Sequence, residues 1–131
     1  MKRAEWLERG VLVGPYYCLC MNEEQFSGAL SDFSFPKPWP NFLSSSRAHA
    51  TTHHLRNEKG DCASVVCLSD TSERTGIEIA GLLLHEAVHI WQEYCISIGE
   101  DDPGHEIEAY SIQWIAQQLM WAFEKQLKGE K

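Results

Sequence analysis

One helical pattern, from Gly76 to Ile98, dominates this sequence. Thr75, just before this pattern, and Glu78, in its first turn, form a T-x-x-E motif, in which the two side chains cap the first turn of a helix. Gly99 follows at once, and glycine most easily adopts the left-handed conformation at which helices end. The sequence therefore predicts one uninterrupted helix from about Gly76 to Ile98.

Two further helices are predicted, one on each side of this pattern in the chain. A short helix from Asn22 to Leu30 has Asn22 as its cap and acidic residues in its first turn. A long helix from about Pro103 to Lys125 has apolar residues at helical spacing, which are Ile112, Ile115, Leu119 and Phe123. Trp91, Trp114 and Trp121 also lie at helical positions, and we expect all three to pack in the core.

Three stretches have the composition of β-strands. Val11–Cys20 is rich in β-branched and aromatic residues, with a break expected at Gly14 and Pro15. Ala48–Leu55 and Ala63–Leu68 flank a turn that contains Gly60, which predicts a hairpin. Alternation along the first hairpin strand separates two sets of side chains, His49, Thr51 and His53 on one face and Ala50, Thr52 and His54 on the other.

Composition limits the compartments and partners that fit this chain. Its formal net charge of -8 disfavours a broad contact with nucleic acid, which needs basic residues facing phosphates. Charged residues interrupt the N-terminal segment before it reaches the length of a signal peptide, and no apolar run is long enough to span a membrane. We therefore expect a single cytoplasmic domain, residues 1–131, that binds neither nucleic acid nor a membrane.

The five cysteines are odd in number and contain no CxxC pair. This usage is typical of reduced, structural thiols. Cys18 and Cys20 are two positions apart on a predicted strand, so both point to one face, where we expect them to pack in the core rather than bind metal.

The strongest chemical signal is the sequence His85-Glu86-Ala87-Val88-His89, an HExxH motif. Four residues of helix turn through about 400° and rise about 6 Å, so His85 and His89 project from one face and can share a tetrahedral zinc ion. Glu86 is rotated by about 100° from His85, which lets its carboxylate act as general base on a metal-bound water. The pattern predicts a Zn²⁺ site.

A catalytic zinc site usually has three protein ligands, so one more is needed. Glu108 is favoured, because it heads the apolar stripe of the second long helix, where a carboxylate needs a cation or hydrogen-bond donors. His105, in the turn that enters this helix, is the alternative. His53 and His54 are weaker candidates on the predicted hairpin.

An HExxH motif followed by 18 residues and a glutamate resembles the gluzincin class of zinc peptidases. The resemblance covers about Ile77 to Leu119 and implies that His85, His89 and Glu108 bind zinc and that Glu86 is the catalytic base. Ile112 occupies the position at which many gluzincins have an acid. The runs GLLLHEAVHIWQEY and EIEAYSIQ are also similar to small uncharacterised phage and prophage proteins.

The resemblance implies a minimal zincin-like α+β domain, with a small sheet or hairpin packed on the HExxH helix and a second C-terminal helix. Its activity would be hydrolysis of a peptide or protein substrate by a zinc metallopeptidase. An inactive zinc-binding module, acting as a phage structural or host-interaction protein, and an SprT-like protease with His105 as third ligand are the alternatives. Candidate oxyanion donors are Tyr94, Tyr110, His53 and His54. The sequence makes no prediction of oligomeric state.

Overall fold

The computed structural model of the chain describes residues 3–10 and 15–129. In these residues one three-stranded sheet is accompanied by three helices. The strands are β1 (Tyr16–Cys20), β2 (Ala50–Arg56) and β3 (Cys62–Leu68). The helices are α1 (Glu23–Asp32), α2 (Gly76–Ile98) and α3 (His105–Leu127). The predicted small α+β fold is confirmed.

The sheet has the order β1-β3-β2, with β1 parallel and β2 antiparallel to β3. The predicted hairpin is β2-β3, and its register pairs Thr52 with Val66 and His54 with Ser64. Of the predicted first strand, the structure shows Tyr16–Cys20 as β1. Residues 11–14 of that prediction lie outside the described part of the chain. Because β2 pairs with β3 alone among the described strands, it is an edge of the sheet.

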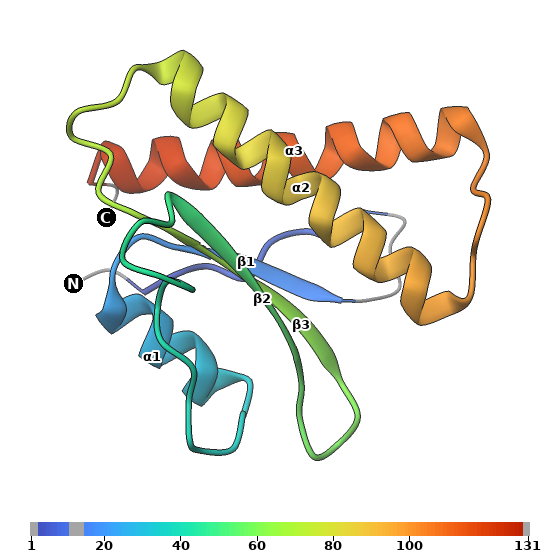
Figure 1. Cartoon of the computed structure of the whole chain (residues 1–131), viewed down its shortest axis with the longest axis horizontal. Helices are drawn as coiled ribbons and strands as arrows, with labels where there is room; N and C mark the ends of the chain where they lie inside the picture. Colours follow the sequence, from blue (N-terminus) through green and yellow to red (C-terminus); the bar gives the residue numbers. More distant parts are fainter. Residues whose placement is uncertain (1–2, 11–14, 130–131) are drawn as a thin grey trace.

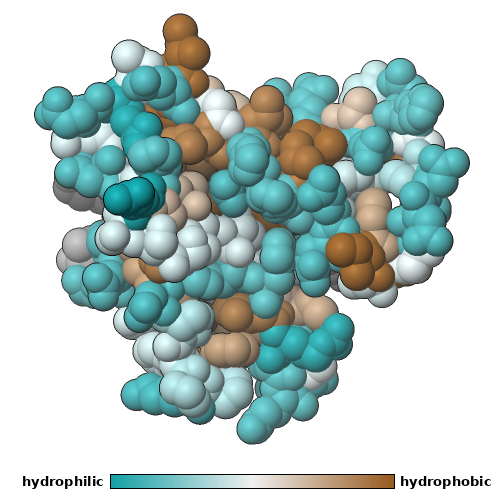
Figure 2. Space-filling view, in the orientation of Figure 1, coloured by the Kyte–Doolittle hydropathy of each residue, from teal (hydrophilic) through white to brown (hydrophobic). Residues whose placement is uncertain are grey.

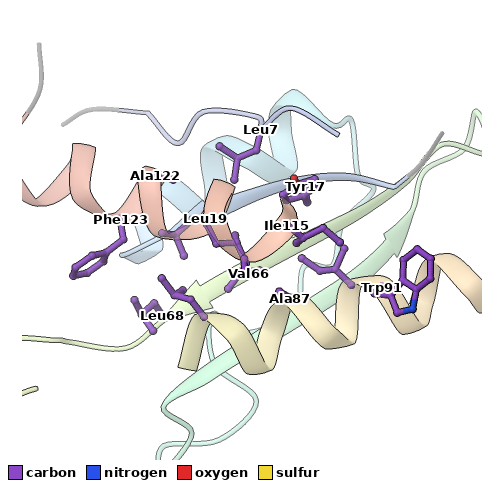
Figure 3. Close-up of a cluster of buried hydrophobic side chains, with 14 of the residues drawn as sticks. Leu7, Tyr17, Leu19, Val66, Leu68, Ala87, Trp91, Ile115, Ala122 and Phe123 are labelled. Atoms are coloured by element: carbon purple, nitrogen blue, oxygen red, sulfur yellow. The ribbon is translucent and has the colours of Figure 1, made fainter. Parts of the chain in front are cut away.

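Helices cover both faces of the sheet, α2 and α3 one face and α1 the other (Figure 1). Between the sheet and the two long helices lies the larger core cluster, drawn in Figure 3. Tyr17 and Leu19 of β1 meet Val66 of β3 there, and Ala87 and Ile115 pack on them from the helices. Burial of this apolar surface fixes α2 over the sheet.

The smaller core cluster lies between the sheet and α1. Cys18 and Cys20 are fully buried there with Cys67 of β3, and all three are free thiols. Phe26 and Leu30 of α1 pack in the same cluster. The predicted packing role of Cys18 and Cys20 is confirmed.

Helix α2 has the predicted bounds. The Thr75 hydroxyl accepts the Glu78 amide, and the Glu78 carboxylate accepts the Thr75 amide, so both halves of the capping box are formed. Gly99 ends the helix at a φ of 73°, in the left-handed region. Glu78 is therefore a capping residue. None of the helices in the described ranges is long and apolar enough to cross a membrane.

The three tryptophans predicted to be core residues differ in burial. Trp91 is buried, but Trp114 is 40% exposed and Trp121 is 50% exposed, so the prediction is wrong for these two. The buried side of α3 includes Ile115 and Leu119, and the two tryptophans lie on another side of the helix. Helical spacing groups residues on one face but does not say whether that face is covered.

Candidate functional site

His85 and His89 lie one turn apart on the solvent side of α2. Their Nε2 atoms are 3.1 Å apart, and the two rings meet edge to face. Both side chains are exposed, so neither is a core histidine held by buried partners. The face seen in Figure 2 is mostly hydrophilic, with hydrophobic residues in separate patches.

The distance between these two nitrogens fits two positions of a zinc site. Zinc–nitrogen bonds of about 2.0–2.1 Å in a tetrahedron place two ligand nitrogens about 3.3 Å apart. The observed 3.1 Å is close to this separation. Without metal, the N–H of one neutral imidazole donates a hydrogen bond to the unprotonated nitrogen of the other, because each neutral ring has one donor and one acceptor.

Glu86 points from α2 toward the sheet edge and is only 6% exposed. Its Oε1 accepts a hydrogen bond of 2.6 Å from the hydroxyl of Thr52 on β2. A buried carboxylate needs such a donor, because the charged oxygens have left water. Sequence reasoning placed Thr52 on its correct strand face but missed its contact with Glu86.

His54 lies on the same side of β2 as Thr52, because the two are separated by two positions on the strand. Its Nδ1 forms a hydrogen bond of 2.8 Å with the Ser64 hydroxyl, and Nε2 is the nitrogen left for another partner. Desolvation lowers the pKa of His54, while the charge of Glu93 raises it and that of His89 lowers it further. His54 therefore lies on the face of β2 from which Thr52 reaches α2.

The other two histidines of the hairpin segment lie elsewhere. His53 stacks on Phe26 at a ring distance of 4.9 Å, and its Nε2 donates to the Phe42 carbonyl at 2.9 Å. His49 contacts the guanidinium of Arg74. The sheet thus separates His53, on the α1 side, from His54, on the α2 side.

The structure does not bring Glu108 to the histidine pair. Its Oε2 accepts a hydrogen bond of 2.8 Å from the indole of Trp91. Trp91 is buried and lies about 120° around α2 from His85. In residues 3–10 and 15–129, no group of three His, Cys, Asp or Glu side chains is placed to hold a metal ion.

His105, the other predicted ligand, is the exposed first residue of α3. The metal roles of Glu108 and His105 remain predictions.

The four candidate oxyanion donors differ in their positions. Tyr94 packs against Trp91, with ring centroids 5.6 Å apart, and Tyr110 is 67% exposed on α3. His53 faces α1, as described above. Of the four, His54 is the one that shares its strand face with Thr52, the residue that donates to Glu86 of the HExxH motif.

No protein-family model, curated protein or solved structure matches this chain. The resemblance to gluzincins therefore rests on the motif at residues 85–89 and its spacing to Glu108.

Proposed function

We propose that this protein is a zinc-dependent peptide hydrolase of the cytoplasm, with its site between α2 and β2. The observation that carries the proposal is the His85–His89 pair, whose Nε2 atoms are 3.1 Å apart as in two zinc ligands. Glu86, which follows His85 in the motif, has its carboxylate anchored to Thr52 on β2. Two ligand histidines and a carboxylate base are three of the groups that a metal-activated hydrolysis uses.

No three His, Cys, Asp or Glu side chains of the described residues already surround one point, so we propose that His54 moves toward the histidine pair on metal binding and is the third protein ligand, in place of the predicted Glu108. Its bond to Ser64 is the kind of outer contact that fixes the tautomer and orientation of a ligating imidazole. The bond between Thr52 and Glu86 ties this part of β2 to α2, two positions from His54. Glu108, by contrast, already has the Trp91 indole as a partner.

Bound zinc would supply a Lewis acid and lower the pKa of a water molecule. Glu86 would take the proton from that water at Oε2, because Oε1 is held by the Thr52 hydroxyl. The same hydroxyl fixes the direction of the carboxylate, so Thr52 is a positioning residue. The edge position of β2 leaves one side of the strand open to an extended peptide chain.

A zinc-binding module without hydrolytic activity is the second candidate, and one observation favours it. Glu86 is 6% exposed and already has a short hydrogen bond, which limits its access to a substrate. Such a module would use the metal for stability or for contact with another protein, including a phage or host protein.

Metal content separates the proposed ligands. We expect about one zinc per purified chain in the wild type by elemental analysis, with zinc lost in His89→Ala and His54→Ala. His53→Ala is the matched control, because His53 neighbours His54 but faces α1. Glu108→Gln should retain zinc; loss of zinc there, with retention in His54→Ala, would assign the third ligand to Glu108. Loss of zinc in His105→Ala, with retention in His54→Ala, would assign the third ligand to His105.

Activity separates the two candidate functions. Glu86→Gln should retain zinc and lose cleavage of a fluorogenic peptide library by about 10²- to 10⁴-fold, the usual contribution of a general base. Zinc in the wild type without cleavage would favour the binding module. Wild-type protein without zinc after purification and after titration with Zn²⁺ would reject both functions.

A further inference from the structure

Helix α3 carries an exposed apolar stripe on the side away from the core. Its members are Ile107 (56% exposed), Tyr110 (67%), Trp114 (40%) and Trp121 (50%). At 100° per residue these four positions fall within an arc of about 60°. Exposed aromatic residues in one row mark an interaction surface rather than ordinary solvent exposure.

The middle of α3 is also free of charge. Residues 109–123 contain no Asp, Glu, Lys, Arg or His, although the chain has a net charge of -8. Gln113 and Gln117 supply the polar groups beside the stripe, and a glutamine amide can both donate and accept a hydrogen bond. A basic partner would be attracted to carboxylates, which residues 109–123 lack. Two cations adjoin the band: Lys125 lies over the Trp121 ring and is paired with Glu5, and Arg9 lines the neighbouring hollow. Two cations are fewer than the basic cluster that an anionic membrane attracts.

A hollow of about 580 Å³ adjoins the stripe. Tyr110, Ser111 and Trp114 line it from α3, and Gly10 lies on its other side. The Ser111 hydroxyl is buried and has no hydrogen-bond partner in the described residues. The surface therefore offers both an apolar projection, at Trp121, and an apolar recess about two turns away.

The two ends of α3 carry opposite charges. Glu106 and Glu108 are in the first turn, whereas Lys125, which pairs with Glu5, and Lys128 lie at or just after the last turn, next to Glu124. Glu106 and Lys128 both lie close to the arc of the apolar stripe, at helical positions about 40° apart. Two antiparallel copies of this helix would place acidic ends against basic ends.

We propose that this stripe is the contact surface of a homodimer, formed by antiparallel packing of two α3 helices about a two-fold axis near Gln117. In this register Trp121 of one copy enters the hollow beside Trp114 of the second copy. Glu106 faces Lys128 of the second copy at each end. A two-fold contact of this kind uses the same patch on both subunits, so the patch must be complementary to itself. The opposite charges of Glu106 and Lys128 meet this condition when the two helices are antiparallel.

The first test is sedimentation equilibrium over a range of concentrations. The wild type should form dimers, and Trp121→Glu should weaken dimerisation by at least about 100-fold, since buried aromatic residues dominate such contacts. Ile96→Glu is the matched control, because Ile96 is 73% exposed but lies on α2. Circular dichroism establishes that each variant is folded.

The second test uses the charges and requires no apolar substitution. Glu106→Lys and Lys128→Glu should each weaken the dimer by about tenfold, and the double variant should restore it, because both ends again pair opposite charges. This recovery is specific to an antiparallel pair of identical chains. A wild type that stays monomeric at every concentration overturns the proposal, as does monomeric protein that instead floats with lipid vesicles. Equal weakening by Ile96→Glu and Trp121→Glu also overturns it.

Discussion

Thr52→Val tests the contact that joins α2 to the edge of the sheet. The substitution preserves the shape and β-branching of the side chain but removes the hydroxyl that donates to Glu86. Glu86 is 6% exposed, so water has little access to replace the lost donor. The carboxylate then remains buried beside a methyl group.

The expected loss follows from the geometry of this bond. A hydrogen bond to a charged group contributes about 1.5–3 kcal/mol, and the 2.6 Å separation is in the short range of such bonds. We expect the free energy of unfolding to fall by about 2 kcal/mol. For a domain of this size, this corresponds to a decrease in Tm of about 6–8 °C.

Urea unfolding followed by circular dichroism, with metal removed by chelation, measures this loss. Thr51→Val is the matched control, since its hydroxyl lies on the other face of the same strand and accepts the Ser44 amide in an exposed hydrogen bond. We expect the control to lose about 0.5–1 kcal/mol. In a double-mutant cycle of Thr52→Val with Glu86→Leu, the coupling energy should be about 1–2 kcal/mol.

Equal losses of stability in the two threonine variants, together with zero coupling to Glu86, would contradict this prediction. The anchoring of Glu86 by β2 would then be wrong. The position assigned to His54 opposite α2 would lose its main support, whatever the metal content of the protein.

Glu108→Leu should lower the free energy of unfolding by about 1–3 kcal/mol because the buried Trp91 indole loses its acceptor, whereas Glu108→Gln should lose less; urea unfolding compares them. Thr75→Ala should lower the free energy of unfolding by about 1 kcal/mol in the same assay. An unchanged urea midpoint would show that the capping box does not stabilise the protein. Burial raises the pKa of the Cys67 thiol, so the folded state holds its proton more tightly than the unfolded state does. Stability should therefore fall as the pH rises above 9.0, the ordinary value of the thiol, and Cys67→Ala should reduce this dependence; an identical slope in the variant would contradict the assignment.

The sequence alone determined the features that depend on neighbours in the chain. Helix α2 begins after Thr75 and ends at Gly99 because a capping box and a left-handed glycine act within one turn. The alternation of β2 likewise placed Thr52 and His54 on one face, since successive side chains of a strand point to opposite sides. The spacing of His85 and His89 fixed them on one side of a helix for the same local reason.

Only the tertiary structure decided which of these faces meet. Spacing along the chain could not show that Glu108 contacts Trp91, or that Thr52 is the partner of Glu86, because these contacts depend on how helices pack on the sheet. The same limit applies to Trp114 and Trp121, which have the helical spacing expected of a buried face but lie on the exposed side of α3. A period in the sequence states which residues share a face, and packing between distant segments determines what covers it.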